Sequence, residues 1–278
     1  FYSLIALIMK IRKKKCMCLG VGVEEKNLLR KSNRFWLEFL TRMVNRFTVR
    51  ELQLRENEKI KPIKSEKNIQ PTADIVFSRS VNKLQQENKR FNIFLADIFD
   101  IFPDLDKETF QAEMMEVIRQ IINMGYDVYM IPFTNTKDQK FNDEICEKVN
   151  SVRCHSIKYS KDLDEMTEEI AKGHFSLCMR FHAIVLSVIY EIPMCSISYG
   201  DKSSKLMDRI NMKKYNMDFG DNNGLQKNYI NLNAQDIMEK IHMMLENEKS
   251  IHANLTEQCQ KLKKESLENY LILKEYME

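Results

Sequence analysis

The sequence lacks three features that would place a protein at once: a strong excess of one charge, a long apolar run and regularly spaced cysteine pairs. Its 43 Lys and Arg residues nearly balance its 40 Asp and Glu residues, which leaves a formal net charge of +3 over 278 residues. A chain this close to neutral has no overall field that would make nucleic acid an obligatory partner. We therefore expect no nucleic-acid partner, and any basic binding site must be local.

The apolar run at the start of the chain, residues 1–9, is too short to cross a bilayer. The basic residues at 12–15 follow this run, whereas a secretory signal carries its positive charges before the apolar stretch. We therefore expect a buried helix that leads into a strand, and no transmembrane segment. Because the chain begins with Phe1 and such a helix would have no earlier residues to cover it, we also expect the sequence to be truncated at its start.

The seven cysteines are odd in number and show no paired spacing, which predicts reduced thiols and a cytoplasmic protein. The spacing of His174, Cys178 and His182 would suit a metal ion only on a continuous helix, and a strand is predicted to end between them. We therefore expect no metal site. The basic cluster at residues 12–15 is either a solvated loop or a peripheral contact with the inner face of a membrane.

From residue 91 onward, strand-like apolar runs alternate with amphipathic segments of helical spacing. This order predicts an α/β fold with a doubly wound parallel sheet. The predicted strands are 91–96, 127–133, 154–159, 175–179 and 194–199. The predicted helices are 108–124, 138–149, 163–171, 182–190 and 203–210. A polar stretch before residue 91 predicts domains at 1–88 and 89–250, followed by a long amphipathic helix at 251–278.

Polar side chains follow three of the predicted strands. In an open parallel sheet, ligands bind outside the carboxyl ends of the strands, so the residues at these ends are the candidates for binding a substrate. The candidates are Arg180 and His182, Tyr199 and Lys202, and Pro132 and Phe133.

Arg180 and His182 lie at the predicted start of a helix, where the backbone N–H groups favour an anion. A guanidinium at this place can bind a carboxylate or a phosphate through two hydrogen bonds. The alternative is that Arg180 pairs with a neighbouring acid while His182 caps the helix or packs. The residues alone leave both interpretations open.

These segments resemble the motifs of the polysaccharide pyruvyltransferase family, in which one strand ends in Met-Arg-Leu-His and a proline-led strand ends in Ser-Tyr-Asp-x-Lys. This sequence has Met-Arg-Phe-His at residues 179–182 and Ser-Tyr-Gly-Asp-Lys at 198–202, after Pro193. Further segments in the family's order lie at 20–22, 48–51, 72–77 and 131–138. The sequence departs from the pattern at Phe181, at the inserted Gly200, and at residues 50–54, where Arg-Glu-Leu-Gln-Leu replaces Arg-Asp-x-x-Ser.

The resemblance implies two Rossmann-like domains as in the GT-B glycosyltransferases, the first of them incomplete. It implies transfer of a pyruvate ketal to a sugar of a polysaccharide or of a lipid-linked saccharide precursor. The donor would be phosphoenolpyruvate, as a substrate, with no cofactor. Arg180 and His182 would be catalytic and would bind the donor, and Arg50 would be either a second anion clamp or the partner of an acid across the domains. The remaining substrate contacts would come from Tyr199, Lys202, Pro132 and Phe133.

Two other functions stay open, because a fold does not decide a reaction. A GT-B glycosyltransferase that uses a nucleotide sugar would usually carry paired glutamates near the ribose and phosphates. Here Glu191 stands alone in the corresponding loop. The other alternative is an inactive, truncated homologue, which the altered segment after Arg50 favours.

Overall fold

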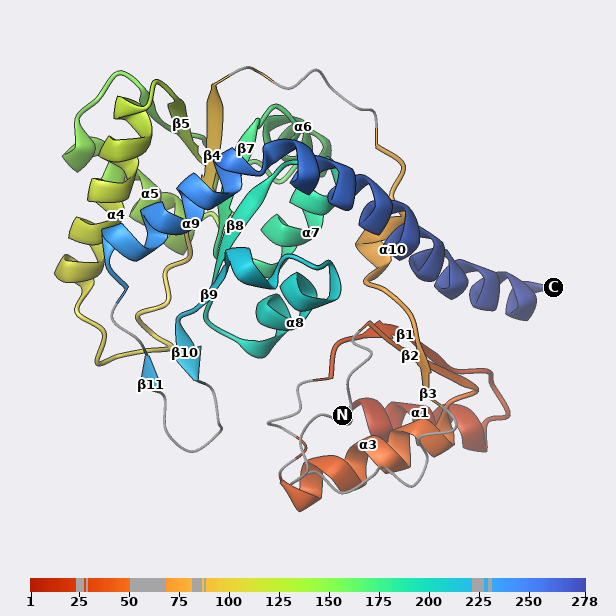
Figure 1. The fold of residues 1–278 in the computed structure, drawn as a ribbon. Helices are drawn as coiled ribbons and strands as arrows, with labels where there is room; N and C mark the ends of the chain where they lie inside the picture. Colours follow the sequence, from red (N-terminus) through yellow and green to blue (C-terminus); the bar gives the residue numbers. More distant parts are fainter. Residues whose placement is uncertain are drawn as a thin grey trace. The chain divides into compact units, whose positions relative to one another are not determined.

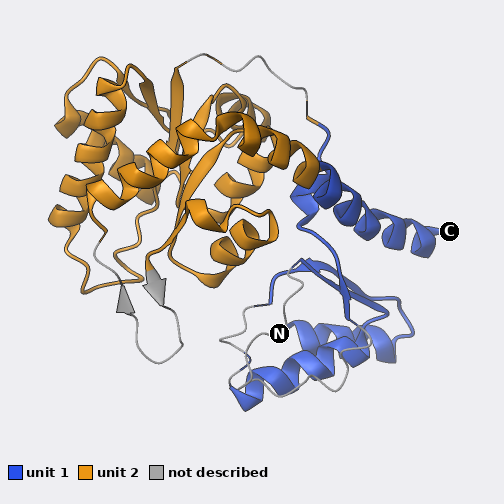
Figure 2. Cartoon of the chain, viewed as in Figure 1, with its two compact units in different colours: residues 1–80, 260–278 blue, residues 81–259 orange. Residues whose placement is uncertain are grey.

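The computed structural model describes residues 1–23, 28, 30–50, 69–81, 87, 89–221, 228–229 and 232–278. The chain divides into two compact units, which Figure 2 shows in different colours. Unit 1 contains residues 1–80 and 260–278, and unit 2 contains residues 81–259. The predicted domain limits at residues 88 and 250 stay a prediction. The polar, lysine-rich sequence at 56–67 predicts a surface connection, and these residues lie outside the described part of the chain.

Unit 1 is built on a three-stranded parallel sheet in the order β1-β2-β3. The strands are β1 (Met17–Val21), β2 (Arg46–Val49) and β3 (Ile69–Pro71), and the helices are α1 (Tyr2–Ile11), α3 (Lys31–Met43) and the 3-10 turn η2 (Ile75–Ser78). Gly20 lies within β1 and has a φ of +62°, and a Cβ there would come within 2.8 Å of the Ile75 side chain of η2. Glycine is therefore required where β1 passes η2.

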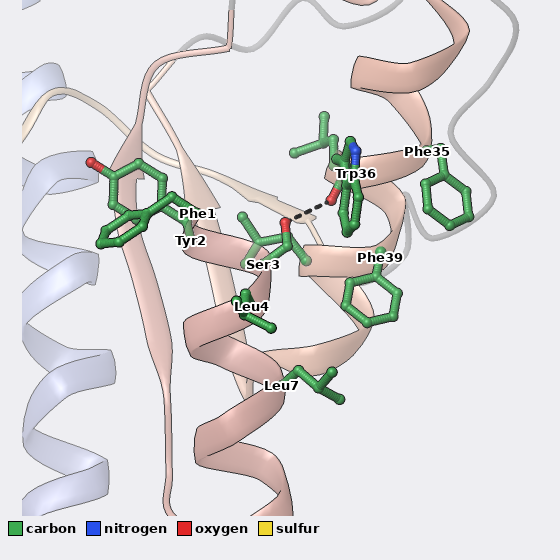
Figure 3. A pocket seen from close by; sticks show the side chains of 10 residues that line it. Phe1, Tyr2, Ser3, Leu4, Leu7, Phe35, Trp36 and Phe39 are labelled. Carbon is green, nitrogen blue, oxygen red and sulfur yellow. Dashed lines mark hydrogen bonds between the residues drawn. The ribbon is translucent and has the colours of Figure 1, made fainter.

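The prediction of a buried first helix is wrong. Helix α1 buries only Ser3 and Ala6, while the side chain of Tyr2 is 74% exposed. A helix of this length buries one face, and that face of α1 packs against α3. Between the two helices lies an apolar pocket of about 650 Å³, in which the Ser3 hydroxyl donates to the Trp36 carbonyl (Figure 3).

Unit 2 is built on a six-stranded parallel sheet in the order β6-β5-β4-β7-β8-β9 (Figure 1). Its strands are β4 (Arg90–Phe94), β5 (Asp127–Met130), β6 (Cys154–Ser156), β7 (Phe175–Cys178), β8 (Met194–Ser198) and β9 (Asn216–Asp218). Counted from β4, this order is the 3-2-1-4-5-6 order of doubly wound dinucleotide-binding folds. The predicted doubly wound parallel sheet is confirmed. Strands β10 (Gly220–Asp221) and β11 (Asn228–Tyr229) form a separate antiparallel pair.

The helices of unit 2 form two groups. Helix α4 contacts α5 and α9, and helix α7 contacts α6 and α8. Their bounds are α4 (Lys107–Asn123), α5 (Lys137–Val149), α6 (Leu163–Ala171), α7 (Phe181–Ile189), α8 (Asp201–Arg209) and α9 (Ala234–Glu246). Strands β4, β7 and β8 are buried along their whole length, as expected for a parallel sheet covered on both faces. Helix ends follow local signals, because Asp106 and Asp162 cap α4 and α6.

The predicted long helix at the end of the chain is confirmed as α10 (Glu248–Met277). Its last part belongs to unit 1, where Asn269 is buried and its amide oxygen accepts from the Thr48 hydroxyl on β2. The Ser266 hydroxyl donates to the Asp74 carbonyl over 2.9 Å. Unit 1 is therefore assembled from residues at both ends of the chain.

Candidate functional site

The topology of unit 2 singles out one place on the sheet. Strands β4 and β7 are neighbours, and the chain leaves β4 toward β5 and leaves β7 toward β8, in opposite directions. Ligands of open α/β sheets bind at such a switch point, outside the carboxyl ends of the strands. The residues just beyond the two strand ends include Asp97 after β4 and Arg180 after β7.

Arg180 is the N-cap residue of α7, and its side chain is 24% exposed. Its Nη2 donates to the carboxylate of Asp138, and its Nη1 donates to the hydroxyl of Tyr199 over 3.4 Å. The Nε is buried and has no hydrogen-bond partner among the described residues. In the alternative interpretation Arg180 pairs with a neighbouring acid, and that acid is Asp138. The ion pair leaves the Nε donor of the guanidinium unused.

Burial by itself would lower the pKa of Arg180, but the hydrogen bond with Asp138 and the interactions with Tyr199 and Asp138 outweigh it. The pKa of the guanidinium is consequently raised above its ordinary value. Arg180 thus stays a cation at the switch point.

Asp138 lies in the first turn of α5 and is fully buried. Its carboxylate accepts from the backbone N–H of Asp97 over 3.3 Å and from that of Phe133 over 3.2 Å. Its own N–H donates to the Thr134 hydroxyl over 3.1 Å. One carboxylate therefore ties together the chain after β4, the chain after β5 and Arg180 after β7.

The other predicted residues of unit 2 lie at the same edge of the sheet. Tyr199 follows β8 and touches Arg180, and Lys202 lies in the first turn of α8. His182 is exposed in the first turn of α7, with its ring centroid 5.3 Å from that of Phe181.

Pro132 and Phe133, which follow β5, also lie at this edge. Pro132 is buried, and the Phe133 ring packs edge-on against Phe94 with centroids 5.8 Å apart. The structure therefore joins Arg180, Tyr199 and Phe133 directly or through Asp138.

Arg50 belongs to unit 1. Its Nη1 lies 2.6 Å from Oδ2 of Asp74, and both side chains are largely buried. A Cβ at Gly22 would lie 2.7 Å from the Arg50 guanidinium, so this glycine leaves the space that the arginine fills. The acid that Arg50 pairs with lies in its own unit, whereas the sequence suggested an acid across the domains. Residues 51–54 of the motif lie outside the described residues.

The described part of the chain contains no group of three or more His, Cys, Asp or Glu residues placed to hold a metal ion. The Nε2 of His174 lies 3.0 Å from Oε1 of Glu248. None of the described helices is both long enough and apolar enough to span a membrane.

Residues 2–201 of the chain match the protein family described as Polysaccharide pyruvyl transferase. This range includes Arg50, Arg180, His182 and Tyr199 and ends one residue before Lys202. A search of curated proteins finds no match.

Solved structures resemble the chain in fold. A putative UDP-N-acetylglucosamine 2-epimerase from Listeria monocytogenes is 13% identical, with a TM-score of 0.57 over 91% of this chain and 64% of that one. The UDP-GlcNAc 2-epimerase from Neisseria meningitidis, bound to UDP-GlcNAc, is 12% identical, with a TM-score of 0.58 over 97% and 73%. An O-GlcNAc transferase from Thermobaculum terrenum is 7% identical, with a TM-score of 0.51 over 100% and 55%.

These neighbours are GT-B-like, so the predicted fold class is confirmed. Sequence identities this low support a statement about the fold alone. The chain spans less than two thirds of the length of the Listeria protein.

Proposed function

The chain belongs to the polysaccharide pyruvyl transferase family, and from this membership we propose that it transfers pyruvate from phosphoenolpyruvate to a sugar as a ketal. The observation that carries the proposal is the cationic Arg180 at the switch point of unit 2, with a donor left over beyond its bonds to Asp138 and Tyr199. Phosphoenolpyruvate carries a carboxylate and a phosphate, and a guanidinium binds either group in bidentate fashion.

The reaction needs three things from the protein. A proton must reach the methylene carbon of the enol, the positive charge that develops at the neighbouring carbon must be tolerated, and two sugar hydroxyls must attack that carbon in turn while phosphate leaves. Arg180 would hold the donor anion at the start of α7, where the helix dipole also favours negative charge. The exposed His182 in the same turn would deliver the proton or donate a hydrogen bond to the anion.

The other predicted residues complete the proposal. Tyr199 would orient Arg180, and Lys202 at the start of α8 would add positive charge. Pro132 and Phe133 would line the site beside Asp138. Arg50 would serve as a second anion clamp after releasing Asp74.

The acceptor belongs to the proposal as well. We place the sugar in a polysaccharide or a lipid-linked saccharide precursor, and the enzyme in the cytoplasm or at the inner face of the membrane. A family defined by pyruvyl transfer to polysaccharides supports a sugar acceptor.

The test is calorimetric titration of phosphoenolpyruvate, and separately of uridine diphosphate, into the chain and its variants. Hydrogen bonds to a charged group contribute about 1.5–3 kcal/mol, so we expect Arg180→Ala to weaken phosphoenolpyruvate binding by about 10- to 100-fold. Arg180→Lys keeps the charge but loses the planar fork, and should recover part of this affinity.

Uridine diphosphate is the control ligand, because the Neisseria neighbour is bound to UDP-GlcNAc. Binding of uridine diphosphate alone would favour a glycosyltransferase, and binding of neither ligand would favour an inactive homologue. Either result contradicts the proposal. The variant His182→Ala then separates two roles, because loss of transfer rate at unchanged affinity indicates proton delivery and loss of affinity indicates anion binding.

A further inference from the structure

Two cysteines that are eight positions apart come together in unit 2. Cys146 lies near the end of α5, and Cys154 is the first residue of β6. Their sulfur atoms are 3.2 Å apart and share a hydrogen bond, and both side chains are partly exposed. All seven cysteines of the chain are described, and none of them forms a disulfide in the structure.

Contacts on the same faces of α5 and β6 hold the two sulfurs in this position. Asp143, one turn before Cys146, accepts from Nζ of Lys158 over 3.2 Å and from the hydroxyl of Ser156. Gln139, a further turn back, donates to the Ser156 hydroxyl over 3.1 Å. Residues three and four apart share one face of a helix, and alternate residues share one face of a strand. The contact between the two sulfurs is therefore one of a series of contacts between one face of α5 and one face of β6.

The backbone between the two cysteines is also fixed. Asn150 ends α5 in the left-handed region, with a φ of 51°, and its N–H donates to the Cys146 carbonyl over 3.1 Å. The N–H of Cys154 donates to the Ser151 carbonyl over 3.0 Å, and Cys154 is paired in register with Val128 of β5. A disulfide needs the sulfurs at about 2.05 Å, so the pair must close from 3.2 Å.

The two thiols are not equivalent. The hydrogen bond with Cys146 lowers the pKa of Cys154, although burial acts in the opposite direction. The same hydrogen bond, together with burial, raises the pKa of Cys146. Cys154 is therefore the thiolate that would attack an oxidant, and Cys146 is the thiol that would resolve the product.

From this geometry we propose that Cys146 and Cys154 form a dithiol oxidation site, which hydrogen peroxide converts into an intramolecular disulfide. In the first step the Cys154 sulfur attacks one peroxide oxygen, an S–O bond forms, the O–O bond breaks, and hydroxide leaves. In the second step the Cys146 sulfur attacks the sulfenic acid, the S–S bond forms, the S–O bond breaks, and the oxygen departs as water. Two thiols and one peroxide thus give one disulfide and two waters, and a dithiol reductant reverses the reaction.

Buried cysteines of the same unit provide the internal reference. Cys178 and Cys195 are buried, and burial raises the pKa of Cys178 to about 11 and that of Cys195 further. Neither thiol should react with peroxide at neutral pH while the chain is folded, because thiols react as thiolates.

The experiment treats the folded, reduced chain with one equivalent of hydrogen peroxide, blocks the remaining thiols under denaturing conditions, and digests it with trypsin without reduction. Cleavage after Lys140, Lys148, Arg153 and Lys158 puts the two cysteines on separate peptides, 141–148 and 154–158. We expect these peptides to appear as one disulfide-linked species, with two fewer blocked thiols per chain. Links between other cysteines in place of this one, or no link at all, would overturn the proposal.

Variants assign the two roles without relying on any transfer activity, so this proposal and the proposed function fail or stand separately. In Cys146→Ser the linked species should vanish while peptide 154–158 takes up dimedone, the trap for a sulfenic acid. In Cys154→Ser neither product should form. Cys259→Ser, a partly exposed cysteine outside the pair, should behave like the parent chain. If Cys146 in the Cys154→Ser variant takes up dimedone as fast as Cys154 does in the Cys146→Ser variant, the assignment of Cys154 as the attacking thiolate is wrong.

Discussion

At the scale of single residues, Arg180 and Asp138 depend on each other. The carboxylate of Asp138 is fully buried and receives two backbone N–H groups in addition to the guanidinium. A buried charge that loses its partner is costly, whereas a neutral amide of the same size is not. The pair therefore contributes to stability at the same place where the arginine is proposed to bind substrate.

This dependence predicts a rescue. Arg180→Ala should lower the free energy of unfolding by about 3–5 kcal/mol, because it strands the Asp138 carboxylate. Adding Asp138→Asn should recover most of that loss, while phosphoenolpyruvate binding stays weak. Urea denaturation and calorimetry on the single and double variants measure the two effects separately. Recovery of both stability and binding in the double variant would show that Arg180 is not part of the phosphoenolpyruvate site.

A second residue-scale prediction concerns pH. Burial opposes ionisation of Glu169, but hydrogen bonds and charges from Lys172 and the buried Arg90 prevail and lower its pKa below the ordinary 4.5. A lowered folded pKa stabilises the fold above the unfolded pKa, and this contribution disappears as pH falls through the folded value.

Glu169→Gln should therefore be less stable than the parent at pH 7, and the difference should shrink as pH falls below about 4.5. Denaturation at a series of pH values measures it, with the exposed neighbour Glu168→Gln as the matched control. A difference that does not change with pH would show that the Glu169 ion pairs are not its cause.

The sequence predicts Arg180 as a site residue but does not predict its pairing with Asp138. A polar residue directly after a buried strand can be recognised locally, because ligands of open α/β sheets bind at the strand ends. Asp138 lies 42 positions from Arg180, so their pairing exists only after β5 and β7 take their places in one sheet. The contact of Cys146 with Cys154 was missed for a related reason, because a spacing of eight residues carries no signal until α5 packs against β6.

At the scale of elements, Asn269 on α10 connects two strands of unit 1. Its side chain is buried, its oxygen accepts from the Thr48 hydroxyl on β2, and its nitrogen donates to the Ala73 carbonyl just after β3. These hydrogen bonds thus hold the segment 260–278 to the residues of β2 and to the chain just after β3.

Asn269→Leu should destabilise unit 1 by about 1–3 kcal/mol, because it removes the acceptor of the buried Thr48 hydroxyl and a donor to the Ala73 carbonyl. The chain has a single tryptophan, Trp36, which lies in unit 1, so its fluorescence follows the unfolding of this unit. Glu268→Gln, a change at the adjacent and only partly buried position, is the control. Equal stability of the two variants would show that Asn269 does not secure the sheet.

Most elements of unit 2 were predictable, because alternating apolar and amphipathic runs decide them locally. Their ends were less so, and the strand predicted at 127–133 stops at Met130. The edge strand β9 was missed, since Asn216–Asp218 is short and partly polar and is defined by its pairing with β8. The buried α1 was also wrongly predicted, because an apolar run does not reveal how many of its faces find a neighbour.

At the scale of the whole molecule, unit 1 needs both ends of the chain. A stop codon at Gln260 should remove the contacts of Ser266 and Asn269 and expose the sheet of unit 1, while unit 2 keeps its own core. Hydrogen exchange measured by mass spectrometry should show lost protection in β1 and β2 and unchanged protection in β4, β7 and β8. Removing only Glu278 is the control. Loss of protection in both units would show that they do not fold as separate bodies.

The position of Asn269 also has a consequence for biosynthesis. Its partner Thr48 precedes it by 221 residues, so Asn269 is translated after the whole of unit 2. Domains of a growing chain usually fold from the amino terminus onward. Here residues 1–80 must wait for residues 260–278, so unit 2 can complete its sheet during translation before unit 1 does. Ribosomal pausing between the codons for residues 259 and 269 would therefore prolong the exposure of unit 1.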